Sequence, residues 1–149
     1  MESPVIQPKF TSAESDTMQK QLYLKNCKGK GRGVFCNQPL LKDEIIESVP
    51  LIIIPASQKV WVSESKLADY FFNYNEEEDA VALALGFGSL YNHAEQSNAG
   101  YCIDYEHKQI DFYALKAIPA HLEICINYGG AYGKNYKEWF EARNIPYKK

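Results

Sequence analysis

Three short segments of the sequence combine residue types that can bind a ligand or carry out chemistry. The first is Lys30-Gly31-Arg32-Gly33, in which two glycines flank one residue. Glycine lets a backbone approach a ligand closely or adopt a positive φ. Alone, the segment is ambiguous, because a Gly-x-Gly marks a β-turn more often than a cofactor loop. It also lacks the third glycine and the helix start of a dinucleotide-binding fingerprint.

The second segment covers residues 86–98, where a glycine-rich bend leads into Asn92 and His93. An asparagine side chain offers a donor and an acceptor, so it can bridge an amino-acid-like ligand. The competing interpretation is that Asn92 caps a turn and that His93 is a hydrogen-bonded core residue. For an arbitrary Asn-His pair this second interpretation is the more frequent one.

The third segment, residues 122–129, reads as a short strand that ends in Tyr128 and Gly129. A phenol at the end of a strand can project into a pocket. In isolation, such a residue is more often a core tyrosine whose hydroxyl has a buried partner.

The elements that must position these segments are mostly short strands. Alternation over residues 21–25 and the apolar residues 34–36 predict two strands on either side of a loop at 27–33. The apolar run before Pro55 predicts a strand over residues 44–54 that is buried on both faces. Further strand-like patterns lie at residues 101–105, 109–115 and 123–127.

Two short helices and one acidic loop complete the expected organisation. Ser63 or Ser65 caps the first helix, which presents Leu67, Tyr70 and Phe71 on one side. The second helix, over residues 135–143, carries an aromatic face. We interpret residues 73–79 as a solvated loop, since no EF-hand pattern fits them. Many short strands separated by turn residues predict one mainly β domain over residues 21–149, behind a flexible leader at 1–20.

Composition excludes several classes of protein. The chain has 149 residues, of which 46% are hydrophobic and 23% charged, so the body of the chain is globular rather than disordered. The net charge is −3 and no Lys/Arg run exceeds two residues, so direct nucleic-acid binding is not expected. The sequence shows neither a signal peptide nor an apolar stretch of ~18 residues, which favours an intracellular protein without membrane contacts.

The cysteines and histidines do not predict a metal site. The four cysteines form no CxC or CxxC pair, and the three histidines lie in unlike contexts. A structural zinc site usually draws its four ligands from such paired spacings. Unpaired thiols suit a reducing compartment.

In their order along the chain, the three segments resemble SET-domain protein lysine methyltransferases. The stretches LALGFGSLYNHAEQSNAGY and IDFYALKAIPAHLEICINYGG are most similar to minimal microbial and viral members, which lack a cysteine-rich zinc module. The resemblance covers residues 22–132. It implies the β-fold of that family, with small sheets and a knot-like crossing of the C-terminal segment. It also implies methyl transfer from S-adenosyl-L-methionine (AdoMet) to the side-chain amine of a lysine.

The resemblance also implies a role for individual residues. The resemblance implies that Asn92 holds the amino-acid end of AdoMet and that the backbone of His93 meets the adenine. Lys30, Gly31, Arg32 and Gly33 would contact AdoMet mostly through main-chain atoms. Tyr128 corresponds to the catalytic tyrosine and also contacts the cofactor. The substrate channel takes Tyr70, Ile126 and Tyr132. Ile126 leaves the number of methyl groups added undecided.

The sequence departs from the family pattern at two places. Ala94 and Ser97 replace the usual Ser and Pro, and His121-Leu122-Glu123 stands where the family has Gly-Glu-Glu. We expect these changes to loosen a turn and remove a hydrogen bond. The expected partner is a lysine-containing protein or peptide, with histones or other basic proteins as candidates, and a homodimer completing the substrate groove stays open. The nucleus fits a eukaryotic or viral source and the cytoplasm a bacterial one. The alternative function is a non-catalytic SET-like module that binds peptide or AdoMet.

Overall fold

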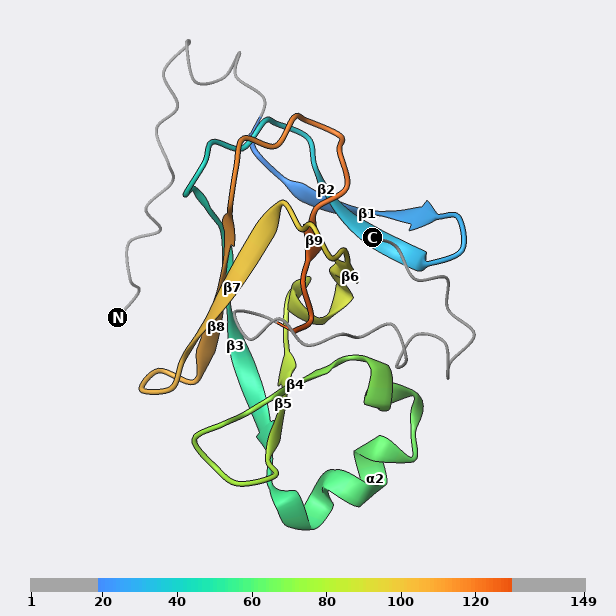
Figure 1. The fold of residues 1–149 in the computed structure, drawn as a ribbon, viewed down its shortest axis with the longest axis vertical. Coiled ribbons are helices and arrows are strands. Elements are labelled where there is room, and N and C mark those ends of the chain that lie inside the picture. Colours follow the sequence, from blue (N-terminus) through green and yellow to red (C-terminus); the bar gives the residue numbers. More distant parts are fainter. Residues whose placement is uncertain (1–18, 130–149) are drawn as a thin grey trace, which may run out of the picture.

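The described part of the chain, residues 19–129 of this computed structural model, consists mostly of short strands (Figure 1). Two of them form a hairpin, five form the largest sheet, and two form a short parallel pair. The strands are β1 (Leu22–Cys27), β2 (Gly31–Cys36), β3 (Ile45–Ile54), β4 (Phe71–Asn73), β5 (Val81–Ala84), β6 (Asn92–His93), β7 (Ala99–Asp104), β8 (Gln109–Ala114) and β9 (Cys125–Ile126). The helical segments are α2 (Lys59–Ser63) and the 3-10 turns η1 (Ala56–Gln58), η2 (Lys66–Asp69) and η3 (Gly88–Leu90).

The five-stranded sheet has the order β4-β5-β3-β8-β7, and all its neighbouring strands are antiparallel. The expectation that β3 is buried on both faces is wrong. Leu51 is 8% exposed, whereas its neighbour Ile52 is 49% exposed. An antiparallel sheet can leave one face in contact with water, and successive side chains point to opposite faces, so an unbroken apolar run need not be buried throughout.

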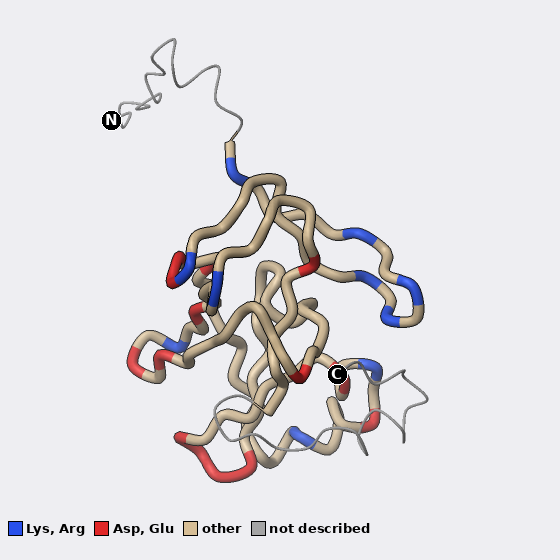
Figure 2. The backbone as a smooth tube through the Cα atoms, turned by 45° about the horizontal axis from the view of Figure 1, so that its top comes forward, with Lys and Arg blue, Asp and Glu red and all other residues tan. Residues whose placement is uncertain are grey.

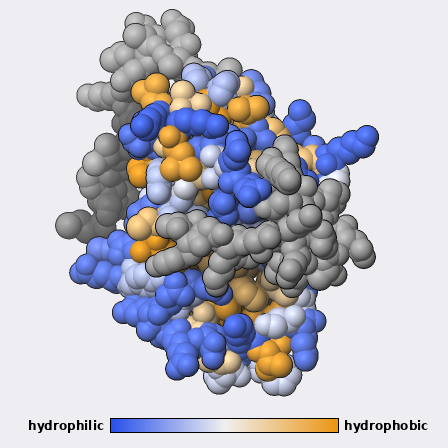
Figure 3. Space-filling view, in the orientation of Figure 1, coloured by the Kyte–Doolittle hydropathy of each residue, from blue (hydrophilic) through white to orange (hydrophobic). Residues whose placement is uncertain are grey.

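The hydrophobic core lies against the inner face of this sheet. Strand β8 shows the alternation most clearly, since Ile110, Phe112 and Ala114 are buried and the residues between them are partly exposed. Rings from two other strands pack on Phe112: Phe72 of β4 at 6.2 Å and Tyr101 of β7 at 6.3 Å, measured between ring centroids. Some apolar residues outside this core, such as Trp61, are exposed. On the face drawn in Figure 3, apolar side chains stand in small groups among hydrophilic ones.

The β1–β2 hairpin is longer than the sequence suggests. We expected a loop over residues 27–33, but β2 begins at Gly31 and pairs with Cys27, so the turn is confined to residues 28–30. Gly31 has φ +74°, a conformation that favours glycine. Lysine and arginine residues lie along both strands of the hairpin (Figure 2).

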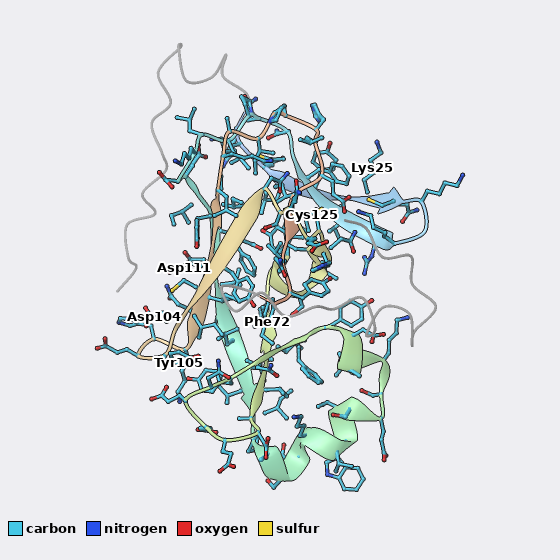
Figure 4. All side chains as sticks on the ribbon, viewed as in Figure 1. Lys25, Phe72, Asp104, Tyr105, Asp111 and Cys125 are labelled. Atoms are coloured by element: carbon cyan, nitrogen blue, oxygen red, sulfur yellow. The ribbon has the colours of Figure 1, made fainter. Side chains whose placement is uncertain are left out.

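The parallel pair β6–β9 joins two segments that are distant in the sequence. Asn92 lies opposite Cys125 and His93 opposite Ile126. The strand expected at residues 123–127 is thus reduced to two residues. A bridge between Val34 and Ile124 attaches the hairpin beside this pair. Figure 4 labels Cys125 on β9 and Lys25 on the neighbouring hairpin.

The helices and chain ends differ in detail from the expectations. The Ser65 hydroxyl accepts a hydrogen bond from Leu67 N at 3.2 Å, but the helix that it caps ends at Asp69, and Phe71 already belongs to β4. Lys20 pairs with Glu44, so the expected leader gives way to ordered contacts at its last residues. The remainder of the leader, the helix at 135–143 and the knot-like crossing fall outside the described residues. Within residues 19–129, no helix is long and apolar enough to span a membrane.

Replacing Gly88 by Ala should destabilise the protein by about 1–3 kcal/mol, because the added methyl overpacks the core. The new Cβ would lie 2.6 Å from Ala84 Cβ and 3.0 Å from Val49 Cγ2. Urea unfolding measures the effect. Ser48→Ala, at an exposed position of β3, is the control and should change stability by less than about 0.5 kcal/mol. Equal midpoints for the two variants would show that Gly88 is not needed for packing.

Candidate active site

The two glycines of the hairpin serve different purposes. A Cβ on Gly31 would meet no atom within 4 Å, so this glycine serves its positive φ. A Cβ on Gly33 would lie 2.5 Å from Glu123 Oε2 and 3.1 Å from Asn92 Nδ2. Gly33 is therefore required by close packing. A hairpin backbone that passes this near to Asn92 fits a ligand held by main-chain contacts.

The Asn92 side chain connects three segments of the chain. Its Nδ2 donates to Arg32 O on the hairpin at 3.1 Å and to Glu123 Oε2 before β9 at 2.7 Å. Asn92 itself lies in β6. The predicted cofactor residues at 30–33 and Asn92 are thus brought together, and the interpretation of Asn92 as a simple turn cap does not hold.

Glu123 is a site residue that the sequence reasoning missed. Its Oε1 accepts from Lys30 Nζ at 2.5 Å, and both side chains are largely buried. Burial alone would lower the pKa of Lys30, but the hydrogen bond to Glu123 and nearby negative charge outweigh it and raise that pKa. Lys30 is therefore charged, and its side chain is directed to Glu123. The sequence signals were the position of Glu123 in the third segment and its match to the last residue of the family's Gly-Glu-Glu pattern.

His93 packs against the predicted catalytic tyrosine. It is 4% exposed, and burial lowers its pKa despite the opposing charge of Glu95, so the ring is neutral. Its Nδ1 accepts a hydrogen bond from Tyr128 N at 3.0 Å, and the two rings are 5.1 Å apart. This bond fixes the backbone from which the Tyr128 side chain projects.

The Tyr128 hydroxyl has a defined orientation. It donates to the backbone oxygen of Tyr91 at 2.8 Å. Burial, with negative charge on surrounding groups that include Cys125 and Tyr70, raises the pKa of Tyr128. The phenol is therefore neutral at physiological pH. Because its proton points to the Tyr91 carbonyl, the oxygen lone pairs face elsewhere.

Tyr91 is held in turn by Glu47 on β3. The Tyr91 side chain is 1% exposed, and its hydroxyl donates to Glu47 Oε1 at 2.8 Å. Burial raises the pKa of Glu47, and the hydrogen bonds from Tyr91 and from Phe87 N oppose that rise. The carbonyl that orients Tyr128 thus belongs to a residue fixed at both its backbone and its side chain.

A second asparagine supports the approach to β9. Asn98 donates from Nδ2 to Glu123 O at 2.9 Å and accepts at Oδ1 from Cys125 N, also at 2.9 Å. One side chain therefore satisfies two backbone groups of the segment that carries Glu123. Asn98 ends the second sequence segment, but it was not assigned to the site.

The residues assigned to the substrate channel have different environments. Tyr70 follows η2 and lies near enough to Tyr128 to influence its pKa. Ile126 is fully buried in the hydrophobic core. Tyr132 lies outside the described residues. Tyr101 was not anticipated here, yet its hydroxyl donates to Tyr128 O at 3.4 Å and its ring contacts Phe72.

Two segments that depart from the family pattern are hydrogen-bonded in this structure. His121, which stands in place of a glycine, adopts φ +64°, donates from its backbone to Cys36 O at 2.8 Å, and bonds the Tyr23 hydroxyl through Nδ1 at 2.6 Å. Leu122 is exposed, and Ala94 is buried with its N–H donating to Ile126 O at 3.0 Å. Within residues 19–129, no three His, Cys, Asp or Glu side chains gather in a way that could hold a metal ion.

Comparison with known proteins agrees with this arrangement. Residues 31–129 match the sequence model of the SET domain. A Schizosaccharomyces pombe histone-lysine N-methyltransferase specific for H3 lysine-37 is 29% identical over 113 residues, which cover 75% of this chain and 76% of that protein.

Solved structures share the fold. A Plasmodium falciparum protein assigned as a histone methyltransferase is 31% identical, with a TM-score of 0.62 over 78% of this chain and all (100%) of that one. A Chaetomium thermophilum polycomb repressive complex 2 bound to S-adenosylmethionine is 22% identical with a TM-score of 0.60, covering 87% of this chain and 18% of that one, and supports the fold alone. The expected fold is confirmed, and the chain belongs to the SET-domain family of AdoMet-dependent protein-lysine methyltransferases.

Proposed function

We propose that this chain methylates a lysine of a histone and that Tyr128 is its catalytic residue. The observation that carries the catalytic assignment is the hydrogen bond from the Tyr128 hydroxyl to Tyr91 O at 2.8 Å. Histones are proposed because the S. pombe relative and the P. falciparum structure are both described as histone methyltransferases. A histone substrate places the protein in the nucleus of a eukaryotic cell.

Tyr128 is suited to orientation rather than to proton abstraction. Since its pKa is raised, the hydroxyl is neutral and cannot serve as a phenolate base near pH 7. Since its proton is used by Tyr91 O, its oxygen can accept weak C–H···O contacts or an amine hydrogen bond. When bound, AdoMet supplies the electrophilic methyl group. Much of the rate then comes from alignment of the reacting atoms.

The substrate lysine must react as a neutral amine, although the pKa of a free lysine is about 10.4. Burial among aromatic side chains lowers that pKa, because it disfavours the ammonium form. Phe72 and Tyr101 pack edge to face at 5.2 Å, and the Tyr101 hydroxyl reaches Tyr128 O. These rings supply an apolar surface beside Tyr128.

For the cofactor, the described residues provide a suitable cradle. Gly33 keeps the hairpin backbone close to Asn92, since a Cβ there would lie 3.1 Å from Asn92 Nδ2. Asn92, His93 and the main chain of residues 30–33 would hold AdoMet. The alternative function, a module that binds without turnover, predicts AdoMet binding but no methyl transfer to any histone. Incubation of the four core histones with labelled AdoMet, followed by mass spectrometry, separates the two functions.

Tyr128→Phe should lower kcat at least about 100-fold while AdoMet affinity stays within about threefold, because the loss falls on the transition state. The ring is kept, so stability should fall by only about 0.5–1.5 kcal/mol. Single-turnover kinetics and calorimetric titration with AdoMet measure the two effects. Tyr113→Phe is the control, since it removes the same hydroxyl from the partly exposed face of β8, and it should leave kcat unchanged. A folded Tyr128→Phe variant with wild-type kcat would refute the assignment.

Tyr91→Phe should destabilise the protein more at pH 8 than at pH 5. The pKa of Glu47 is already raised in the fold, so its contribution is favourable below the ordinary value of 4.5 and is lost as pH rises through the folded value. Removing the Tyr91 hydroxyl raises that pKa further. We expect a loss of about 1–3 kcal/mol at pH 8 and a smaller one at pH 5, measured by urea unfolding.

The double variant Tyr91→Phe/Glu47→Gln controls for this pH effect, because a glutamine side chain at that position cannot ionise. Its stability relative to Glu47→Gln alone should be independent of pH. An equal loss for Tyr91→Phe at both pH values would mean that the Glu47 charge is not involved.

A further inference from the structure

We infer that Glu123 is a positioning residue for the amino-acid end of AdoMet. Its carboxylate holds the Asn92 amide so that the carbonyl oxygen of that amide, and not its amino group, is presented to the cofactor. The inference rests on the proposed role of Asn92 in cofactor binding. It assigns a positioning role to a carboxylate that the proposed chemistry at Tyr128 does not use as an acid or a base.

The hydrogen bonds determine which way the Asn92 amide faces. Two oxygen acceptors, Arg32 O at 3.1 Å and Glu123 Oε2 at 2.7 Å, surround one end of the amide. An amide rotated by half a turn would put its own oxygen against both of them. Only the Nδ2 orientation is therefore compatible with its neighbours, and the Asn92 Oδ1 atom is left as the acceptor for a ligand.

The Glu123 carboxylate is itself fixed by three constraints. Lys30 Nζ binds its other oxygen at 2.5 Å. Asn98 holds the Glu123 backbone oxygen at 2.9 Å. Gly33 leaves room for the carboxylate, because a Cβ on Gly33 would lie 2.5 Å from Glu123 Oε2. A carboxylate with so little freedom can define the orientation of a neighbouring amide.

This geometry selects a chemical group on the ligand. An amide with both N–H groups directed at protein oxygens offers only an acceptor, and an acceptor beside a carboxylate favours a cation. AdoMet and its product S-adenosylhomocysteine carry an α-ammonium and an α-carboxylate. We assign the ammonium to Asn92 Oδ1. The α-carboxylate is disfavoured there, because it would face an amide oxygen and the Glu123 charge.

The test compares two ligands that differ in this amino-acid end. S-adenosylhomocysteine has it, and 5′-methylthioadenosine lacks it while keeping the nucleoside. Glu123→Gln should weaken S-adenosylhomocysteine at least about tenfold in calorimetric titrations, because the new side-chain amide can also donate and no longer enforces one orientation of Asn92. The affinity for 5′-methylthioadenosine should change less than about twofold, because that ligand makes no contact with Asn92 Oδ1.

Glu44→Gln is the matched control, because Glu44 also forms an ion pair with a lysine, Lys20, but at a more exposed position. It should alter neither affinity. If Glu123→Gln weakens both ligands equally, or neither, the inference is wrong, since a general loss of site structure would not discriminate between them. Removing one member of a buried pair can also prevent folding. In that case Glu123→Asp decides in the same titrations. It keeps the charge on a side chain one methylene shorter, so it should weaken S-adenosylhomocysteine and spare 5′-methylthioadenosine, and equal effects on both ligands would overturn the inference.

Two further outcomes separate this inference from the proposed function. Asn92→Ala must weaken S-adenosylhomocysteine, and an unchanged affinity would overturn the inference at its basis. Wild-type protein that binds S-adenosylhomocysteine and shows the Glu123→Gln discrimination, but methylates no histone, would support the inference and contradict the proposed function alone.

Discussion

The pairing of β6 with β9 is the contact on which the site depends. It has only two residues in each strand, and so small a pair has little stability by itself. Bonds around it supply the rest: Asn98 reaches Glu123 O and Cys125 N, and Ala94 N reaches Ile126 O. Because Asn92 lies in β6 and Tyr128 follows β9, a shift of either strand would separate the proposed cofactor contact from the proposed catalytic hydroxyl.

The polar groups around this pair form two branches. One branch runs from Lys30 through Glu123 to Asn92, and the other from Glu47 through Tyr91 to Tyr128. Each joins a largely buried carboxylate to a group that faces the proposed ligands. Partly satisfied polar groups are costly when buried, so each branch has few alternative arrangements. In the proposed site, the first branch positions the cofactor and the second the reacting centre.

The sequence predicted most of the short strands, though not β4, β5 or β6, and it singled out the segments that meet at the site, because apolar alternation and the three ordered segments are local signals. It did not predict Glu123 or Glu47 as site residues, since a carboxylate near Asn92 or Tyr91 becomes visible only when distant strands pair. The burial of β3 was mispredicted for a similar reason: Ile52 and Leu51 look alike in sequence, and only the sheet decides which one faces water. His121 shows a different limit, because a positive φ at a non-glycine residue depends on partners such as Tyr23.

The hairpin has an evolutionary consequence. If its contribution to the cofactor is main chain, the exposed side chains of Lys25, Lys28 and Arg32 are not tied to catalysis. Substitutions can then change the charge on the outer surface of the hairpin to suit different partners, while the backbone that faces the ligand keeps its conformation. Gly29, Gly31 and Gly33 are constrained by backbone geometry or packing, and Lys30 is constrained by its bond to Glu123. Divergent relatives can therefore differ widely on the outside of this hairpin and still bind the same small molecule.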